Sequence, residues 1–168
     1  LRRMPGGLIE IYSMTEGGVV CLLAAHEFPD KLHTVGRPAP GSELKVLDDE
    51  ALHVSAKLAA LESLRGGFTT VADAGTRSEG ALDAVASAVR EAGLRCVLGR
   101  ICNDHGLDER GTRDVLAAGE RHLAARRDGD LVHPSLAISV PEMASDATLA
   151  RTAALCSEAG AVFQTHVN

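Results

Sequence analysis

The stretch Ala161-Val-Phe-Gln-Thr-His-Val-Asn168 is an apolar run that predicts a β-strand with His166 at its carboxyl end. It follows Glu158-Ala-Gly160, where the glycine is typical of the position just after a helix. The order is therefore helix, glycine and short strand. Because parallel sheets place ligand and metal sites at the carboxyl ends of their strands, we take His166 as a candidate site residue.

The same order of helix, glycine and strand recurs through residues 51–168. We predict helices over 52–65, 81–92 and 112–127, and a fourth that begins after Ser145, a good N-cap residue. The predicted strands are 68–72, 94–98, 136–140 and 161–168. Apolar residues mark the first helix by their helical spacing, namely Val54, Leu58, Leu61 and Leu64. We therefore expect an α/β fold of parallel βα repeats, either a partial (β/α) barrel of about half the usual eight strands or a flavodoxin-like open sheet.

Composition narrows the possible partners and location. The formal net charge is -6 and the sequence pI about 5.6, so we expect neither nucleic acid nor a membrane as partner. The longest early apolar run, 19–25, is far shorter than the roughly 20 residues of a membrane span. The four cysteines form no Cys-x-x-Cys pair, which favours reduced thiols and a cytoplasmic location.

Residues 1–50 break the βα rhythm, so we predict two parts, 1–50 and 51–168. The first part contains Ile9-Glu-Ile-Tyr-Ser-Met-Thr-Glu-Gly-Gly18 and, after His33, Thr-Val-Gly-Arg-Pro-Ala-Pro-Gly-Ser-Glu. These motifs resemble the acyl-CoA synthetase family of adenylate-forming (AMP-binding) ligases. The resemblance implies that Tyr12 lies near the adenine of ATP, that Thr15 bonds its phosphates, and that Glu16 holds Mg²⁺. That family's Gly-rich phosphate loop and C-terminal lysine do not occur in the sequence.

The second part resembles a different family. Gly67-Phe-Thr-Thr-Val-Ala-Asp73, Arg95-Cys-Val-Leu-Gly-Arg100 and the strand before His166 are similar to the middle of the barrel in cytosine-deaminase-like, metal-dependent amidohydrolases. In that family the fifth strand carries a metal-binding His, followed three residues later by a catalytic Glu. The resemblance implies that His166 binds Zn or Fe and that the Glu lies beyond Asn168. The family's His-x-His pair does not occur.

Polar residues after the other predicted strands are pocket candidates: Asp73, Asn103, Asp104, His105 and Ser139. Ala137-Ile-Ser-Val-Pro-Glu-Met-Ala-Ser145 aligns with Ala-Pro-His-Ala-Pro-Tyr-x-x-Ser in the deaminase relatives. The resemblance implies that Ser139 replaces a His that would touch the substrate. Without the resemblance, Asp73 also fits the cap of a turn, and the residues from Asn103 to Gly106 fit ordinary loop chemistry.

Three functions remain open at this point. The leading hypothesis is a fragment or relative of a metal-dependent amidohydrolase that hydrolyses a C–N bond of a small molecule by metal-activated water, and is inactive as this isolated chain. The alternative is an adenylate-forming ligase that makes an acyl-AMP from ATP and a carboxylate with Mg²⁺. The third is a fused or truncated product without activity. For the isolated chain we expect self-association through open sheet edges.

Overall fold

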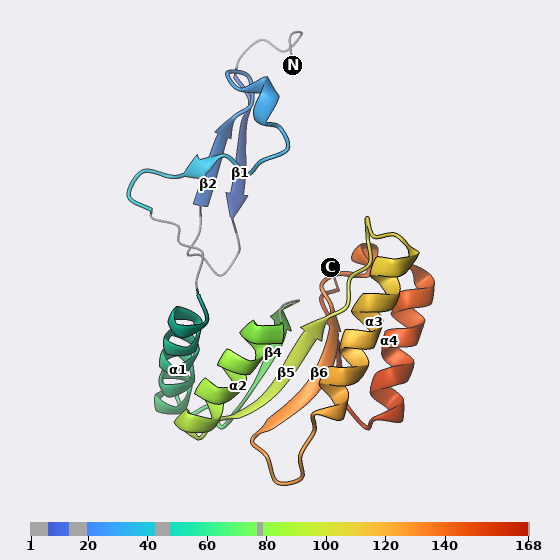
Figure 1. Ribbon diagram of the computed structural model, residues 1–168. Helices are drawn as coiled ribbons and strands as arrows, with labels where there is room; N and C mark the ends of the chain where they lie inside the picture. The colour runs from blue at the N-terminus through green and yellow to red at the C-terminus, as the bar shows by residue number, and fades with distance from the viewer. Residues whose placement is uncertain (1–6, 14–19, 43–47, 77–78, 168) are drawn as a thin grey trace. The chain divides into compact units, whose positions relative to one another are not determined.

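The computed structural model describes residues 7–13, 20–42, 48–76 and 79–167. The chain divides into two compact units, Leu1–Val46 and Leu47–Asn168 (Figure 1). We refer to them as unit 1 and unit 2. Within the described ranges, no helix is both long and apolar enough to cross a membrane.

Unit 1 contains a three-stranded antiparallel sheet in the order β1-β2-β3. The strands are β1 (Ile9–Ser13), β2 (Val20–Ala24) and β3 (Arg37–Pro38), and a short 3-10 turn spans Pro29–Lys31. Cys21 and Leu23 are buried while their neighbours on β2 are only half-buried, as the two-residue period of a strand requires. Strand β1 ends at Ser13, and Thr15 and Glu16 lie outside the described residues.

Unit 2 alternates helices with strands. Its elements are α1 (Asp49–Arg65), β4 (Thr70–Thr76), α2 (Glu79–Ala92), β5 (Arg95–Ile101), α3 (Glu109–Ala124), β6 (Val132–Ile138), a 3-10 turn (Pro141–Met143), α4 (Asp146–Glu158) and β7 (Phe163–Thr165). The strands form one sheet in the order β4-β5-β6-β7, and every pair is parallel. The predicted parallel βα repeats are confirmed.

The helices of unit 2 pack on one face of the sheet (Figure 1). Cys96 and Leu98 of β5 are buried in one cluster with α2, and Leu136 and Ile138 of β6 are buried in a second cluster with α3 and α4. All four residues have even numbers, so the odd-numbered residues of β5 and β6 point to the other face. On β7 the parity is reversed, because Phe163 packs against the second cluster. Side-chain alternation thus fixes which residues can line the inner face of the curled sheet.

Helix α1 forms where the apolar spacing predicts it, but of the four apolar residues that mark it only Leu64 packs against the first cluster. Ala60 is buried and Leu64 packs against the first cluster. Val54, Leu58 and Leu61 are exposed, at 60%, 58% and 43% of their surface. The spacing therefore identified the helix correctly and left its buried face undetermined.

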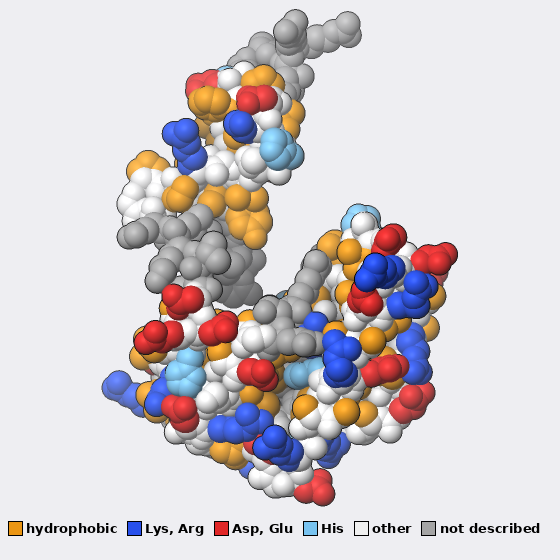
Figure 2. Space-filling view, viewed as in Figure 1, with side chains coloured by type: hydrophobic (Ala, Val, Ile, Leu, Met, Phe, Trp, Pro, Cys, Tyr) orange, Lys and Arg blue, Asp and Glu red, His pale blue; other side chains and the backbone are white. Residues whose placement is uncertain are grey.

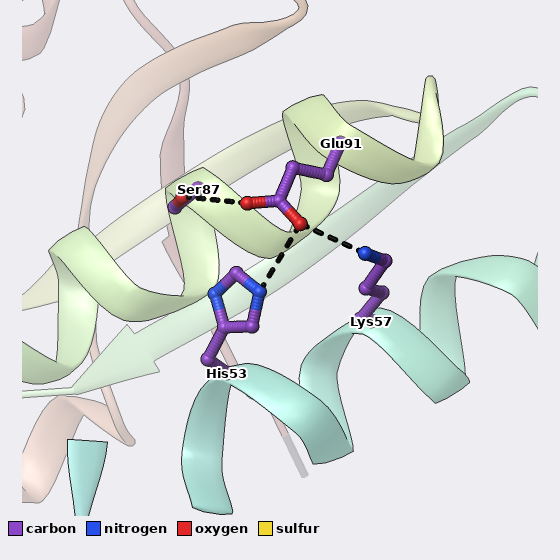
Figure 3. A network of polar contacts seen from close by, with 4 residues as sticks. All are labelled: His53, Lys57, Ser87 and Glu91. Atoms are coloured by element: carbon purple, nitrogen blue, oxygen red, sulfur yellow. Dashed lines mark hydrogen bonds and ion pairs between the residues drawn. The ribbon is translucent and has the colours of Figure 1, made fainter. Parts of the chain in front are cut away.

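A polar network joins α1 to α2 (Figure 3). The carboxylate of Glu91 accepts hydrogen bonds from Lys57 Nζ at 2.8 Å and Ser87 Oγ at 3.3 Å, and its Oε2 lies 3.3 Å from His53 Nε2. The hydrogen bond from Lys57 lowers the pKa of Glu91 most, and the charges of Lys57 and His53 add to this. The carboxylate lies between the hydroxyl and the imidazole, so His53 cannot act as a base on Ser87. We interpret the network as a helix-helix contact.

Asp104, which follows β5, holds the start of α4. Ser145 caps this helix, as expected, by accepting a hydrogen bond from the Thr148 N–H at 3.2 Å. The buried carboxylate of Asp104 in turn accepts bonds from the Ser145 N–H at 2.7 Å, Ser145 Oγ at 2.8 Å and Thr148 Oγ1 at 2.7 Å. Burial raises the pKa of Asp104, but the bonds from Thr148 and Ser145 together outweigh it, so the pKa is lower than usual.

Strand β4 passes very close to β5 at a glycine. Gly75 has φ +77°, and its N–H donates to Asp73 Oδ1 at 2.6 Å. The pairing register of β4 with β5 shifts between Asp73 and Thr76. A Cβ at Gly75 would overlap the carbonyl oxygen of Gly99, so both the backbone angle and the space require glycine here.

Replacing Gly75 by alanine is expected to destabilise unit 2 strongly. The matched control is Gly129→Ala, because Gly129 has a similar φ of +75° but nothing within 4 Å of its added Cβ. Urea denaturation should show a loss of about 1 to 2 kcal/mol in unfolding free energy for the control. The loss for Gly75→Ala should be about 3 kcal/mol or more, because backbone must move. Equal losses in the two variants would contradict the close strand approach.

Replacing Asp104 by asparagine is expected to cost about 1 to 3 kcal/mol of unfolding free energy at pH 7, since an amide nitrogen cannot accept the hydroxyl bonds. The folded pKa of Asp104 lies below the ordinary value of 3.8, so its carboxylate stabilises the fold above that value. The difference between parent and variant should therefore shrink as the pH falls below 3.8. Asp146→Asn, at an exposed position in the first turn of α4, is the control. A difference between parent and Asp104→Asn that does not change with pH would contradict the assignment.

Candidate functional site

A cavity of about 400 Å³ lies at the carboxyl ends of the parallel strands of unit 2. Residues of all four strands or of the segments just after them line it: Ala72, Ala74, Ile101, Ala137, Ile138, Ser139, Gln164, Thr165 and His166. Most of these residues point to the face of the sheet that the helices leave uncovered, as their parity requires. The position agrees with the general rule that open and closed parallel sheets bind ligands at the carboxyl ends of their strands.

His166 lines this cavity directly after β7. Its backbone N–H donates to the carbonyl oxygen of Ser139 at 3.3 Å, which extends the pairing of β6 with β7 by one step. His166 therefore lies at a strand end, where its position in the sequence predicts it, and this strand end faces a cavity. Its role as a metal ligand stays a prediction.

Asn103 and Ser139 form a reciprocal pair beside the cavity. The Ser139 N–H donates to Asn103 Oδ1 at 2.9 Å, and Asn103 Nδ2 donates to Ser139 Oγ at 2.8 Å. Asn103 is buried, at 4% exposure, so these two bonds satisfy an amide that would otherwise lack partners. The structure thus brings three of the sequence candidates together. Asn103 bonds Ser139, and the Ser139 carbonyl accepts the His166 N–H.

Gln164 is a site residue that the sequence analysis missed. Its Nε2 donates to Ser135 Oγ on β6 at 2.7 Å and to the Asp73 carbonyl oxygen on β4 at 3.3 Å. One side chain of β7 therefore reaches across the curled sheet to β4. The signal was present, because Gln164 lies two residues before His166 and must share its face of the strand.

The remaining sequence candidates in unit 2 do not line this cavity. The Asp73 side chain is exposed and accepts the Gly75 N–H, which fits the turn interpretation. Asp104 holds the start of α4. His105 is exposed, and its backbone N–H donates to the Met143 carbonyl at 3.1 Å.

The nucleotide-binding candidates belong to unit 1. Tyr12 lies on β1, pairs with Cys21 in the sheet register and is half exposed. Thr15 and Glu16 lie outside the described residues, so the structure does not place the carboxylate that would hold Mg²⁺.

The chemistry of the described side chains limits what the cavity can do alone. No three His, Cys, Asp or Glu residues of the described ranges lie close enough together to hold a metal ion. Burial raises the pKa of the Cys96 and Cys102 thiols to about 11, so neither is a thiolate near neutral pH. His122 Nε2 is hydrogen-bonded to the Leu98 carbonyl oxygen at 2.9 Å, and burial lowers the pKa of this imidazole. The described lining of the cavity offers one imidazole, of His166, one amide, of Gln164, and two hydroxyls, of Ser139 and Thr165.

Comparison with known sequences gives one family. A family model described as the amidohydrolase family matches residues 22–168. A curated relative, 5-methylthioadenosine/S-adenosylhomocysteine deaminase 2 of Archaeoglobus fulgidus, is 39% identical over 69 residues. That alignment covers 41% of this chain and 16% of the relative, so the chain matches only a small part of the relative's length.

Solved structures give the same fold. An adenosine deaminase from Xanthomonas campestris with bound zinc has a TM-score of 0.60 at 22% identity, covering 73% of this chain and 27% of that chain. A guanine deaminase from C. acetobutylicum with bound guanine has a TM-score of 0.61 at 14% identity, covering 71% and 30%. An atrazine chlorohydrolase from Arthrobacter aurescens TC1 complexed with zinc has a TM-score of 0.59 at 20% identity, covering 71% and 30%. At these identities the likeness shows the fold, a partial barrel of the same architecture.

None of these findings supports the ligase resemblance of residues 1–50. The family match itself begins at residue 22 and takes in more than half of that segment. Because this match covers most of the chain, the chain belongs to the amidohydrolase family.

Proposed function

We propose that unit 2 contributes part of the active site of a metal-dependent amidohydrolase that hydrolyses a C–N bond of a small molecule. The observation that carries the proposal is the position of His166, at the end of a parallel strand and on the wall of a cavity, in a chain of this family. A neutral imidazole at such a position suits Zn²⁺ or Fe²⁺.

The relatives support both parts of the proposal. The curated relative is named as a deaminase, and two of the structural relatives as an adenosine and a guanine deaminase, which favours C–N hydrolysis. Two of the solved structures contain zinc, which favours a divalent metal. The small substrate fits a cavity of this volume, since ligand pockets usually measure roughly 300 to 1,000 Å³.

The described residues do not complete a metal site by themselves. Catalytic zinc sites use about three protein ligands, and the cavity lining offers one, His166. A second group that fixes the ring of a ligating histidine is also typical, and no such partner of the His166 ring occurs among the described residues. What the chain does provide is a fixed backbone position for His166, held by the Ser139 carbonyl.

We also propose a cytoplasmic location. All four cysteines are buried free thiols, which fits a reducing compartment.

The metal proposal predicts weak but localised binding by the 168-residue chain. Titration with Ni²⁺ should broaden NMR signals of residues around the cavity, including Ser139 and Gln164, because His166 faces the same space. His166→Ala should remove this broadening, and the control His105→Ala, at an exposed loop histidine, should leave it. Deaminase assays of the same chain with excess zinc should show no turnover above the blank, since one ligand holds the ion too weakly.

Two results would contradict this proposal. Broadening centred on another histidine, unchanged by His166→Ala, would remove His166 from the metal site. Tight, stoichiometric zinc binding with turnover that depends on His166 would show a complete site that the described residues do not reveal.

We further propose that this chain associates with a second copy through the edges of its parallel sheet. β4 and β7 each pair with only one neighbour among the described strands, and β7 carries no charge that would block pairing. The His166 N–H points to β6, so by the alternation of a parallel ladder the Thr165 N–H points to the outer edge.

Edge pairing predicts a mass above the 17.5 kDa of one chain in light scattering at micromolar concentration. Thr165→Pro should lower the mass toward that of one chain, because proline removes the outward N–H. Thr165→Val, which keeps the N–H, should behave as the parent. A monomeric parent, or equal association of the two variants, would show that this edge does not pair.

A further inference from the structure

The direction of the Ser139 hydroxyl follows from its contacts with Asn103. The Ser139 N–H can only donate, so the Asn103 atom 2.9 Å away is the carbonyl oxygen Oδ1. Asn103 Nδ2 then lies 2.8 Å from Ser139 Oγ and donates to it. Because Oγ accepts this bond, its own proton points away from Asn103. Ser139 lines the cavity, so this hydroxyl can donate to a ligand there.

The same reasoning fixes the amide of Gln164. The Asp73 carbonyl can only accept, so the Gln164 atom 3.3 Å away is Nε2, which also donates to Ser135 Oγ. The other end of the amide, Oε1, receives no hydrogen bond from any residue in the described ranges. Gln164 lines the cavity as well, so Oε1 can accept a hydrogen bond from a ligand.

The rest of the lining is mostly apolar. The other described residues around the cavity are Ala72, Ala74, Ile101, Ala137, Ile138, Thr165 and His166, with no Lys, Arg, Asp or Glu among them. By contrast, Lys and Arg alternate with Asp and Glu over the outer surface of unit 2 that is in view in Figure 2. In the metal-free chain this lining offers an ionised ligand no opposite Lys, Arg, Asp or Glu charge, so an uncharged ligand is favoured.

We propose that the Ser139 hydroxyl and Gln164 Oε1 are the specificity-determining groups of this cavity and that Asn103 is the positioning residue that turns Ser139 into a donor. The ligand class is then a small uncharged molecule that carries a hydrogen-bond acceptor for Ser139 and an N–H for Gln164, as an amide does. This inference rests on the proposed function, in which the cavity receives the substrate. Ser139 is not proposed as a nucleophile, because no described base accepts its proton.

Binding of model amides to the metal-free 168-residue chain tests this inference. The probes are 2-pyridone, which has both groups, N-methyl-2-pyridone, which lacks the N–H, and benzene, which lacks both. Chemical shift titration should show saturable binding of 2-pyridone at Ser139 and Gln164. N-methyl-2-pyridone should bind roughly five- to tenfold more weakly, and benzene more weakly still, because each lost hydrogen bond leaves a polar group unpaired.

Two variants test the roles of the side chains. Ser139→Ala removes the donor and should weaken 2-pyridone binding roughly five- to tenfold. Asn103→Asp keeps the hydroxyl but reverses it, because a carboxylate can accept both the N–H and the O–H of Ser139. Asn103→Asp should weaken the binding of 2-pyridone as much as Ser139→Ala does. The backbone NMR spectrum of this variant should otherwise match that of the parent. Ser157→Ala, at an exposed position of α4 outside the cavity lining, is the control and should bind 2-pyridone within about twofold of the parent.

The outcomes separate this inference from the proposed function. Absence of 2-pyridone binding, equal binding of benzene, or full affinity in Ser139→Ala or Asn103→Asp would overturn it. Metal localised at His166 together with any of these results would leave the hydrolase proposal standing. Ser139-dependent binding of 2-pyridone with metal centred elsewhere would overturn the hydrolase proposal alone.

Discussion

The alternation of side chains along four parallel strands is the constraint on which unit 2 depends. Even-numbered residues of β5 and β6 are buried under α2, α3 and α4, so Ala137 and Ser139 must face the other side. The reversed parity of β7 sends Phe163 to the helices and Gln164 and His166 to that same inner face. A register shift of one residue in any strand would exchange the two sets, placing polar groups in the core and leaving the cavity without them.

Hydrogen bonds at the strand ends turn this alternation into a defined site. Two consecutive residues after β5 point in opposite directions, since Asn103 fixes Ser139 at the cavity while Asp104 fixes the start of α4. The Ser139 carbonyl in turn accepts the His166 N–H and so fixes the backbone of His166. Gln164 adds a link from β7 across the sheet to β4. The cavity wall and the helix layer are therefore stabilised from the same short segment of chain.

Much of this arrangement could be predicted from the sequence, and the failures have physical reasons. Apolar spacing and helix-ending glycines identified the βα repeats and the position of His166, because both depend on local sequence. The choice among Asn103, Asp104 and His105 could not be predicted, since it depends on where Ser139 and Ser145 lie after folding. The exposed Val54, Leu58 and Leu61 show that apolar spacing alone does not reveal which face of a helix finds a partner. Gln164 could have been found from His166, since residues two apart on a strand share a face.

The central claim is that Gln164, Ser139 and His166 share the inner face of a curled parallel sheet. The most direct measurement is a set of proton–proton NOEs from the side-chain amide of Gln164 in the 168-residue chain. The account predicts NOEs to Ser135 on β6 and to Asp73 on β4, which are 29 and 91 residues away in sequence. NOEs from that amide to Leu155 or Cys156 of α4 would place Gln164 on the helix side and would contradict the account.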